Sequence, residues 1–157
     1  MATVKTILLA TDYGEASESA MSTAFELALA LNATVHVVHA FTVEDNMEAD
    51  NFSQAQLAEL QLNSSEKLEA LARGCTGAER LGSVVSRFGE PAALVLSTAE
   101  ELQVDMIVLG SNGRQGISRL LLGSVAETVV RQAKCSVLVA KPTPPSSEGV
   151  AEAEKLG

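Results

Sequence analysis

The feature that most constrains the fold is an apolar run followed directly by spaced glycines and then by a helical pattern. The run from Met106 to Leu109 is continuously hydrophobic, as are strands buried on both faces of a parallel sheet. Gly110, Gly113 and Gly123 follow, and apolar residues then recur at helical spacing over 125–133. Glycines between a strand and a helix lie where doubly wound sheets bind ligands. The stretch therefore predicts an α/β fold with a ligand site at this loop.

The chemistry of the loop favours a phosphate. Gly110 and Gly113 have no Cβ, so their backbone can approach a ligand closely. Gly123 and Ser124 open the next helix, where free N–H groups and the positive end of the helix dipole attract an anion. The alternative is that these glycines only shape turns and helix caps, which is their commoner use. The loop has neither the lysine of a P-loop nor the dinucleotide-binding spacing.

The remaining chain alternates between strand and helix patterns, which implies a parallel sheet with right-handed crossovers. The expected strands are 4–11, 34–41, 83–88, 106–109 and 136–140. The expected helices are 15–31, 53–73, 91–102 and one that begins at 123–124. Asp12 and Glu15 have the spacing of a capping box. Residues 142–157 are rich in proline and lack bulk, so we expect a disordered tail after a single domain at 1–141.

Composition excludes several classes of function. The formal net charge of −9 without a basic stripe argues against a nucleic-acid partner. No run reaches the length of a membrane span, and the first residues lack a signal-peptide pattern. Cys75 and Cys135 are therefore expected to be reduced thiols of a cytoplasmic protein. His36 and His39 project to opposite faces of one strand, so they cannot share a metal. His36 is expected to be packed or hydrogen-bonded, and His39 is assigned no chemistry.

The motif G-x2-G-x9-G-S, which begins at Gly110, resembles the ATP-binding branch of the universal stress protein family. Weaker matches stand elsewhere in the chain: Asp12, His39 and Gly89-x-Pro91. The resemblance covers about residues 3–141. It implies a three-layer α/β/α fold of the adenine nucleotide alpha hydrolase-like type, with a doubly wound five-stranded parallel sheet in the order 3-2-1-4-5.

The resemblance also implies a site for ATP, accompanied by Mg²⁺. The adenine is expected at the ends of the first two strands: Ala10, Thr11, Asp12 and Ala40. The ribose and phosphates are expected along the glycine loop and the following helix: Leu109, Gly110, Ser111, Asn112, Gly113, Arg114, Gln115, Gly116, Gly123, Ser124, Val125 and Ala126. The side chains of Ser111, Asn112 and Ser124 can supply hydrogen bonds.

Two of these residues have alternative roles. Asp12 is expected either to cap the first helix or to bond the nucleotide, with help to a phosphate-bound metal as a further role. Arg114 either neutralises phosphate charge or is a solvated loop arginine. Gly14 and Asn112 differ from the serine and histidine common in the family, and Ala10 and Ala40 are smaller than some counterparts. The adenine wall therefore matches the family less closely than the phosphate loop does.

Family members usually dimerise through their fifth strands. The expected dimer seam is thus Ser136, Val137, Leu138, Val139 and Ala140. A bare apolar edge strand invites uncontrolled pairing, which supports a partner there. The alternative is that the last helix buries this strand within one subunit.

Three functions follow from the motif and the resemblance. The first is a stress-response regulatory homodimer whose nucleotide-dependent conformation is read by a protein partner. The second is a slow ATPase or phosphotransferase, and the third is an interaction module of the same fold without nucleotide. We prefer the first, because the glycine motif is intact while no catalytic base is recognisable. Fold alone does not decide between them.

Overall fold

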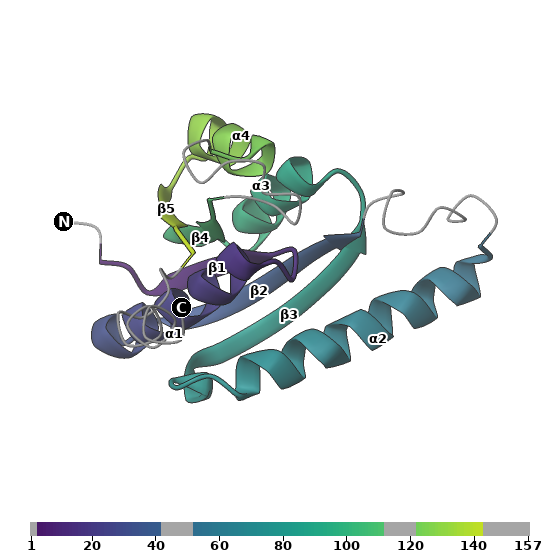
Figure 1. The fold of residues 1–157 in the computed structure, drawn as a ribbon, viewed down its shortest axis with the longest axis horizontal. Coiled ribbons are helices and arrows are strands. Elements are labelled where there is room, and N and C mark those ends of the chain that lie inside the picture. The colour runs from purple at the N-terminus through teal and green to yellow at the C-terminus, as the bar shows by residue number, and fades with distance from the viewer. Residues whose placement is uncertain (1–2, 42–51, 112–121, 143–157) are drawn as a thin grey trace, which may run out of the picture.

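Five parallel strands form one sheet in the order β3-β2-β1-β4-β5, as expected. This computed structural model describes residues 3–41, 52–111 and 122–142. The strands are β1 (Thr6–Thr11), β2 (Thr34–Phe41), β3 (Leu81–Phe88), β4 (Met106–Gly110) and β5 (Ser136–Ala140). The helices are α1 (Glu15–Leu31), α2 (Gln54–Arg73), the short 3₁₀ helix η2 (Ala78–Arg80), α3 (Pro91–Glu101) and α4 (Ser124–Gln132). Helices α1 and α2 cover one face of the sheet, and α3 and α4 cover the other (Figure 1).

The centre of the sheet explains the unbroken hydrophobicity of its strands. In β1, the side chains of Ile7 and Leu9 join the core on the α1 and α2 side, while Leu8 joins the core on the α3 and α4 side. All three are fully buried. In β4, Ile107 and Val108 divide between the two cores in the same way. A strand with helices on both faces has no solvent side, so it carries no polar alternation.

A carboxylate fastens the start of β1 to the start of β4. Asp105 Oδ2 accepts hydrogen bonds from the backbone N–H groups of Lys5 and Thr6 at 2.9 and 3.0 Å. It also accepts from Thr6 Oγ1 at 3.0 Å. The first strand was expected to begin at residue 4, but it begins at Thr6, where this clamp holds the start of β1 beside the start of β4.

A second difference lies at the sheet edge, where β3 begins at Leu81 rather than at Ser83. The pairing of β2 with β3 shifts register between Val35 and Val37. At this shift His36 Nδ1 accepts a hydrogen bond from the Ser83 N–H at 2.9 Å. A Cβ at Gly82 would lie 2.7 Å from two atoms of the His36 ring, so only glycine leaves room for it. The expectation of a hydrogen-bonded His36 is confirmed, and burial lowers the pKa of its imidazole.

Strand β4 and helix α1 approach each other closely at Gly110. A Cβ at Gly110 would lie 2.8 Å from the carbonyl carbon and the Cβ of Ala16, and 3.0 Å from its oxygen. The missing side chain therefore makes room for the first turn of α1. Packing against Ala16 is thus a reason for this glycine that the sequence did not reveal, and the expected close approach of a ligand stays a prediction.

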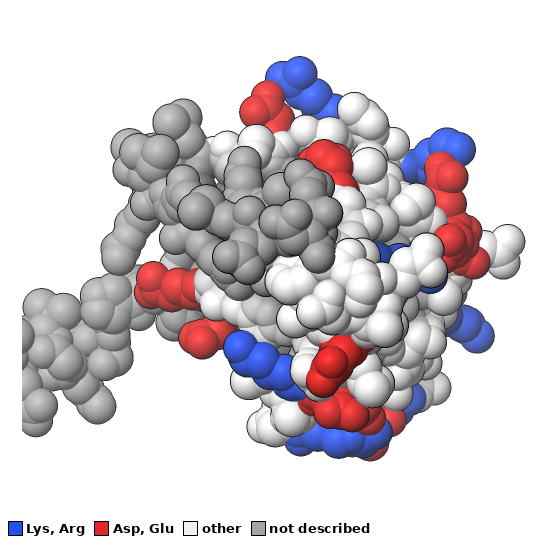
Figure 2. All heavy atoms as spheres, turned by 90° about the vertical axis from the view of Figure 1, so that its right-hand side faces the viewer, with Lys and Arg blue, Asp and Glu red and all other residues white. Residues whose placement is uncertain are grey.

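Other expectations concern the ends and the surface of the chain. Cys75 and Cys135 are free and half-buried. Among the described helices, none is long and apolar enough to cross a membrane. Acidic and basic side chains lie intermixed on the face shown in Figure 2, without a continuous basic patch in its described part. Residues 143–157 lie outside the described residues, so the disordered tail stays a prediction.

Replacing Gly110 with alanine tests the close approach of β4 to α1. We expect Gly110→Ala to lower the free energy of unfolding by about 1–3 kcal/mol, because the new methyl group meets the backbone of Ala16. The matched control is Gly74→Ala. Gly74 has helical φ and ψ of −76° and −10°, and the nearest neighbour to its Cβ position is 3.4 Å away. The control should gain about 0.4–1 kcal/mol. Equal denaturant midpoints for the two variants would contradict the packing argument.

The Asp105 clamp predicts a specific dependence of stability on pH. Hydrogen bonds from the backbone of Lys5 and Thr6, and then from the Thr6 side chain, lower the pKa of Asp105 from its ordinary 3.8. A carboxyl with a lower pKa in the folded chain stabilises the fold above its ordinary pKa and loses this contribution as pH falls through the folded value. We expect wild type to lose stability more steeply than Asp105→Asn below about pH 4. Parallel urea titrations check this, with exposed Glu59→Gln as the control that keeps the wild-type slope.

Candidate functional site

The candidate site lies at the carboxyl ends of β1 and β4, where the chain leaves two adjacent strands in opposite directions. Strand β1 leads into α1 on one face, and β4 leads by way of the glycine loop into α4 on the other (Figure 1). This divergence is the topological switch point of a doubly wound sheet, where ligands bind. Because the strands are parallel, all four α-helices begin near this edge.

The four α-helices differ in how their first N–H groups are satisfied. Helix α2 has a complete capping box made by Ser53 and Gln56. Helix α3 is capped by the carboxylate of Glu90, which accepts from two backbone N–H groups of the first turn at 3.1 and 2.8 Å. Helices α1 and α4 begin after Gly14 and Gly123, and neither glycine provides a side-chain cap. Among the described residues, the two helices at the switch point are therefore the two whose N-cap residues provide no side-chain cap, and such helix ends attract anions.

Asp12 fastens the turn between β1 and α1. Its Oδ1 accepts a hydrogen bond from the Gly14 N–H at 2.8 Å and one from Ser17 Oγ at 2.6 Å. Ser17 Oγ in turn accepts from the Asp12 N–H at 3.1 Å. The predicted capping box of Asp12 and Glu15 is wrong, because Glu15 is the first residue of the helix and Gly14 is its N-cap. Asp12 still satisfies a backbone amide at the start of the helix, that of Gly14, although Asp12 lies two residues before the N-cap.

Ser111 joins three elements at the end of β4. Its N–H donates to the Ala140 carbonyl at 2.9 Å, and its carbonyl accepts from the Gly123 N–H at 2.6 Å. The residue is only 6% exposed, yet within the described part of the chain its Oγ has no hydrogen-bond partner. A buried hydroxyl without a partner costs about 1–3 kcal/mol. The structure thus holds an unsatisfied polar atom beside the open end of α4.

The described part of the predicted site converges on this edge. Ala10, Leu109 and Ala126 are buried in one core cluster, with Val125 packed against it. Thr11 and Asp12 close β1, Ala40 lies half-buried near the end of β2, and Gly110 ends β4. Gly123 and Ser124 begin α4. The other predicted site residues lie outside the described residues: Asn112, Gly113, Arg114, Gln115 and Gly116.

Two residues beside the site were missed by sequence reasoning. His39, which was assigned no chemistry, places Nδ1 2.9 Å from the Thr11 carbonyl oxygen. Because a carbonyl only accepts, Nδ1 carries the proton. Tyr13 has a φ of 64°, in the left-handed region that costs a non-glycine residue about 1–2 kcal/mol. The sequence indicated this turn conformation only through the position of Tyr13 between Asp12 and Gly14.

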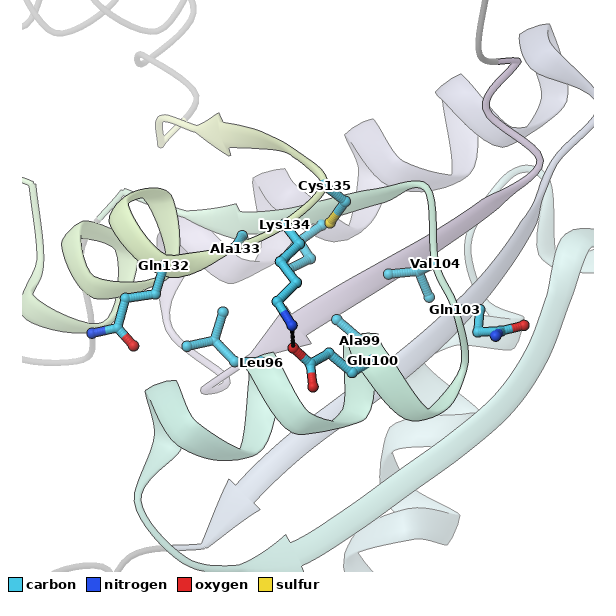
Figure 3. A pocket seen from close by; sticks show the side chains of 10 residues that line it. Leu96, Ala99, Glu100, Gln103, Val104, Gln132, Ala133, Lys134 and Cys135 are labelled. Carbon is cyan, nitrogen blue, oxygen red and sulfur yellow. Dashed lines mark ion pairs between the residues drawn. The ribbon is translucent and has the colours of Figure 1, made fainter.

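A separate hollow lies at the opposite edge of the sheet, between α3 and α4 (Figure 3). It encloses about 320 Å³ and has an apolar floor that includes Val104 and Ile107, at the amino end of β4. An ion pair between Lys134 Nζ and Glu100 Oε1, 2.9 Å long, crosses it. None of the predicted site residues lines this hollow, so it is not part of the candidate site.

Comparison with known proteins agrees with the fold and the motif. The model of the universal stress protein family matches residues 3–141. The universal stress protein MJ0531 of Methanocaldococcus jannaschii is 33% identical over 140 residues, which cover 87% of this chain and 82% of that protein.

Two solved structures show the same fold at lower identity. The hypothetical protein MJ0577 has a TM-score of 0.75 and 24% identity, covering 92% of this chain and all of that one. A universal stress protein in complex with cAMP has a TM-score of 0.61 and 24% identity, covering 90% of this chain and all of that one. The family match spans the strands, the switch point and the glycine motif together, and the chain therefore belongs to the universal stress protein family.

Proposed function

We propose that this protein binds ATP at the switch point between β1 and β4 and acts as a nucleotide-dependent regulatory homodimer in the stress response. One observation carries the proposal: the two helices at this point lack side-chain caps, while α2 and α3 are capped. Free N–H groups at such helix ends are suited to phosphate. The buried hydroxyl of Ser111, which has no hydrogen-bond partner in the described part of the chain, lies at the same place and fits a polar ligand.

The residues present fit a nucleotide in an arrangement that follows the family resemblance. We assign the phosphates to the first N–H groups of α4, beginning at Ser124 and passing close to the Gly123 backbone, together with the hydroxyl of Ser111. The Gly123 N–H itself donates to the Ser111 carbonyl and shapes this turn. We assign the adenine to the ends of β1 and β2, beside Ala10 and Ala40. We also assign the ribose and phosphates to the residues of the glycine loop that lie outside the described part of the chain: Asn112, Gly113, Arg114, Gln115 and Gly116.

The metal is proposed to arrive with the nucleotide. Among the described residues, no group of three or more His, Cys, Asp or Glu side chains could hold a metal ion. Mg²⁺ would therefore be bound chiefly by the phosphates, the mode this ion prefers in nucleotide sites. Asp12 is the carboxylate at the switch point, and its Oδ1 already accepts two hydrogen bonds.

Regulation is proposed in preference to hydrolysis. Asp12 Oδ1 and the Thr11 carbonyl at the switch point are already engaged in internal hydrogen bonds that shape the turn. Phosphoryl transfer needs a group that positions the attacking water, and this hydrogen-bonding pattern favours a structural role for Asp12. The bound state would be read by a regulatory protein partner in the cytoplasm, where ATP is abundant.

The dimer is proposed to form through β5. This strand is at the edge of the sheet, and its residues Val137, Leu138 and Val139 are only half-buried. Helix α4 therefore does not cover the strand fully within one subunit. An edge strand with apolar side chains favours pairing with a second copy.

Calorimetric titration of nucleotide-stripped protein with Mg-ATP tests the nucleotide site. We expect saturable heat for wild type and none for Gly123→Val, because a branched side chain at the N-cap of α4 obstructs the phosphate. Gly123 has a φ of −64°, which valine also adopts, so the variant should fold. Gly74→Ala, remote from the site, is the control and should titrate like wild type.

The same titration with AMP and cAMP determines the ligand preference, since a universal stress protein of the same fold holds cAMP. Repeating the ATP titration with Mg²⁺ removed should weaken binding. A wild-type protein that gives no heat with any of the three nucleotides would contradict the proposed function.

A proline substitution tests the dimer. Ala140 turns its carbonyl toward β4, where it accepts from Ser111, so the neighbouring Val139 presents its N–H to the free edge. We expect Val139→Pro to remove this donor and convert the dimer to a monomer in sedimentation equilibrium, while pairing with β4 persists. Val139→Thr keeps the N–H and should remain dimeric. A dimeric Val139→Pro would show that the interface lies elsewhere.

A further inference from the structure

The turn at the candidate site contains a tyrosine in a conformation that its surroundings must hold. Tyr13 lies between Asp12 and Gly14 with a φ of 64°. Its N–H donates to Thr11 Oγ1 at 3.2 Å. A residue with a side chain persists in the left-handed region only where neighbouring groups fix it. The contacts of the Tyr13 side chain therefore help to fix the shape of the turn, beside the hydrogen bonds of Asp12.

Those contacts come from two other elements. The Tyr13 ring packs against His39 of β2, with 4.6 Å between the ring centroids, and His39 itself donates to the Thr11 carbonyl. From α2, Lys67 Nζ lies 4.6 Å from the centroid of the Tyr13 ring. The Tyr13 hydroxyl lies 3.3 Å from Ser64 Oγ and donates to the Ser64 carbonyl at 3.4 Å. The turn is thus tied both to the sheet and to helix α2.

The amino-terminal half of helix α2 has no buried residue of its own. The buried residues of this helix are Ser64, Leu68 and Ala72, so none of the residues 54–63 is buried. Its amino-terminal end extends past the end of β3 (Figure 1). Ser64 Oγ also accepts a hydrogen bond from Ser86 Oγ of β3 at 3.0 Å. Ser64 is therefore the first buried anchor of α2, and hydroxyl groups of Tyr13 and Ser86 hold it.

We propose that Tyr13 is a positioning residue that fixes the Asp12–Gly14 turn for the nucleotide and couples occupancy of the site to the docking of α2. The inference rests on the proposed nucleotide site. Tyr13 follows Asp12, whose Oδ1 accepts from the Gly14 N–H at the open end of α1. A ligand that binds at the amino end of α1 therefore acts on a turn in which the Tyr13 side chain is hydrogen-bonded to Ser64 of α2.

The chain carries its own reporter for this coupling. It has one tyrosine and no tryptophan, so its tyrosine emission comes from Tyr13 alone. Titration of wild type with Mg-ATP, corrected for nucleotide absorption, should change this emission with the same midpoint as the calorimetric heat. Ser64→Ala, which removes the hydroxyl partner and keeps Tyr13, should bind with a smaller emission change. Ser65→Ala, the neighbouring position in α2, is the control and should respond like wild type.

Hydrogen exchange measures the other end of the coupling. Without nucleotide, Tyr13→Phe should speed exchange of the α2 amides over 54–68 by about 2- to 10-fold, the effect of losing one hydrogen bond. Mg-ATP should change exchange in this segment of wild type and leave that of Tyr13→Phe unaltered.

Binding heat with unchanged tyrosine emission and unchanged α2 exchange would overturn the positioning role and leave the proposed function intact. An absence of heat with every nucleotide would overturn both.

Discussion

The burial of β1 on both faces, with β2 on one side and β4 on the other, is the constraint on which the rest of the structure depends. A central strand without a solvent face requires helices above and below it, and parallel neighbours require every connection to cross over. The connections after β1 and β4 run to opposite faces, which opens the switch point between them. The position of the candidate site is therefore a consequence of strand order, before any ligand-binding side chain is considered.

The helices that begin at the carboxyl edge of the sheet differ in how their amino ends are capped. At α2 and α3, local side chains satisfy the first amides, so these helix entrances are complete without a ligand. At α1 and α4, glycine stands at the N-cap, and the hydroxyl of Ser111 nearby is buried without a partner in the described chain. Natural proteins are locally consistent except where function requires otherwise. Under the proposed function, the open entrances mark the part of the edge where the chain gives up local stability in favour of binding.

Much of the fold was predictable because its signals are local. Helix 15–31 and strands 34–41 and 136–140 have the expected bounds, since apolar periodicity and a stop at Asn32 define them within their own segments. The misses depend on distant contacts. The start of β3 is set by His36 on another strand, and Gly110 makes room for Ala16. The capping box failed because spacing alone does not show which residue enters the helix first. The aromatic and hydroxyl contacts of Tyr13 join three elements, so no single stretch of sequence reveals them.

The clamp between Asp105 and the start of β1 joins residues 100 positions apart in the chain. Pairing of β1 with β2 needs only the first quarter of the sequence, whereas the switch point needs β4 and α4 as well. Contacts between distant residues form late, because long loops must close first. During synthesis, a nascent chain would therefore acquire the β1–β2 pair long before it has a switch point. Any ligand of this site can bind only to the finished molecule, and its binding reports that folding is complete.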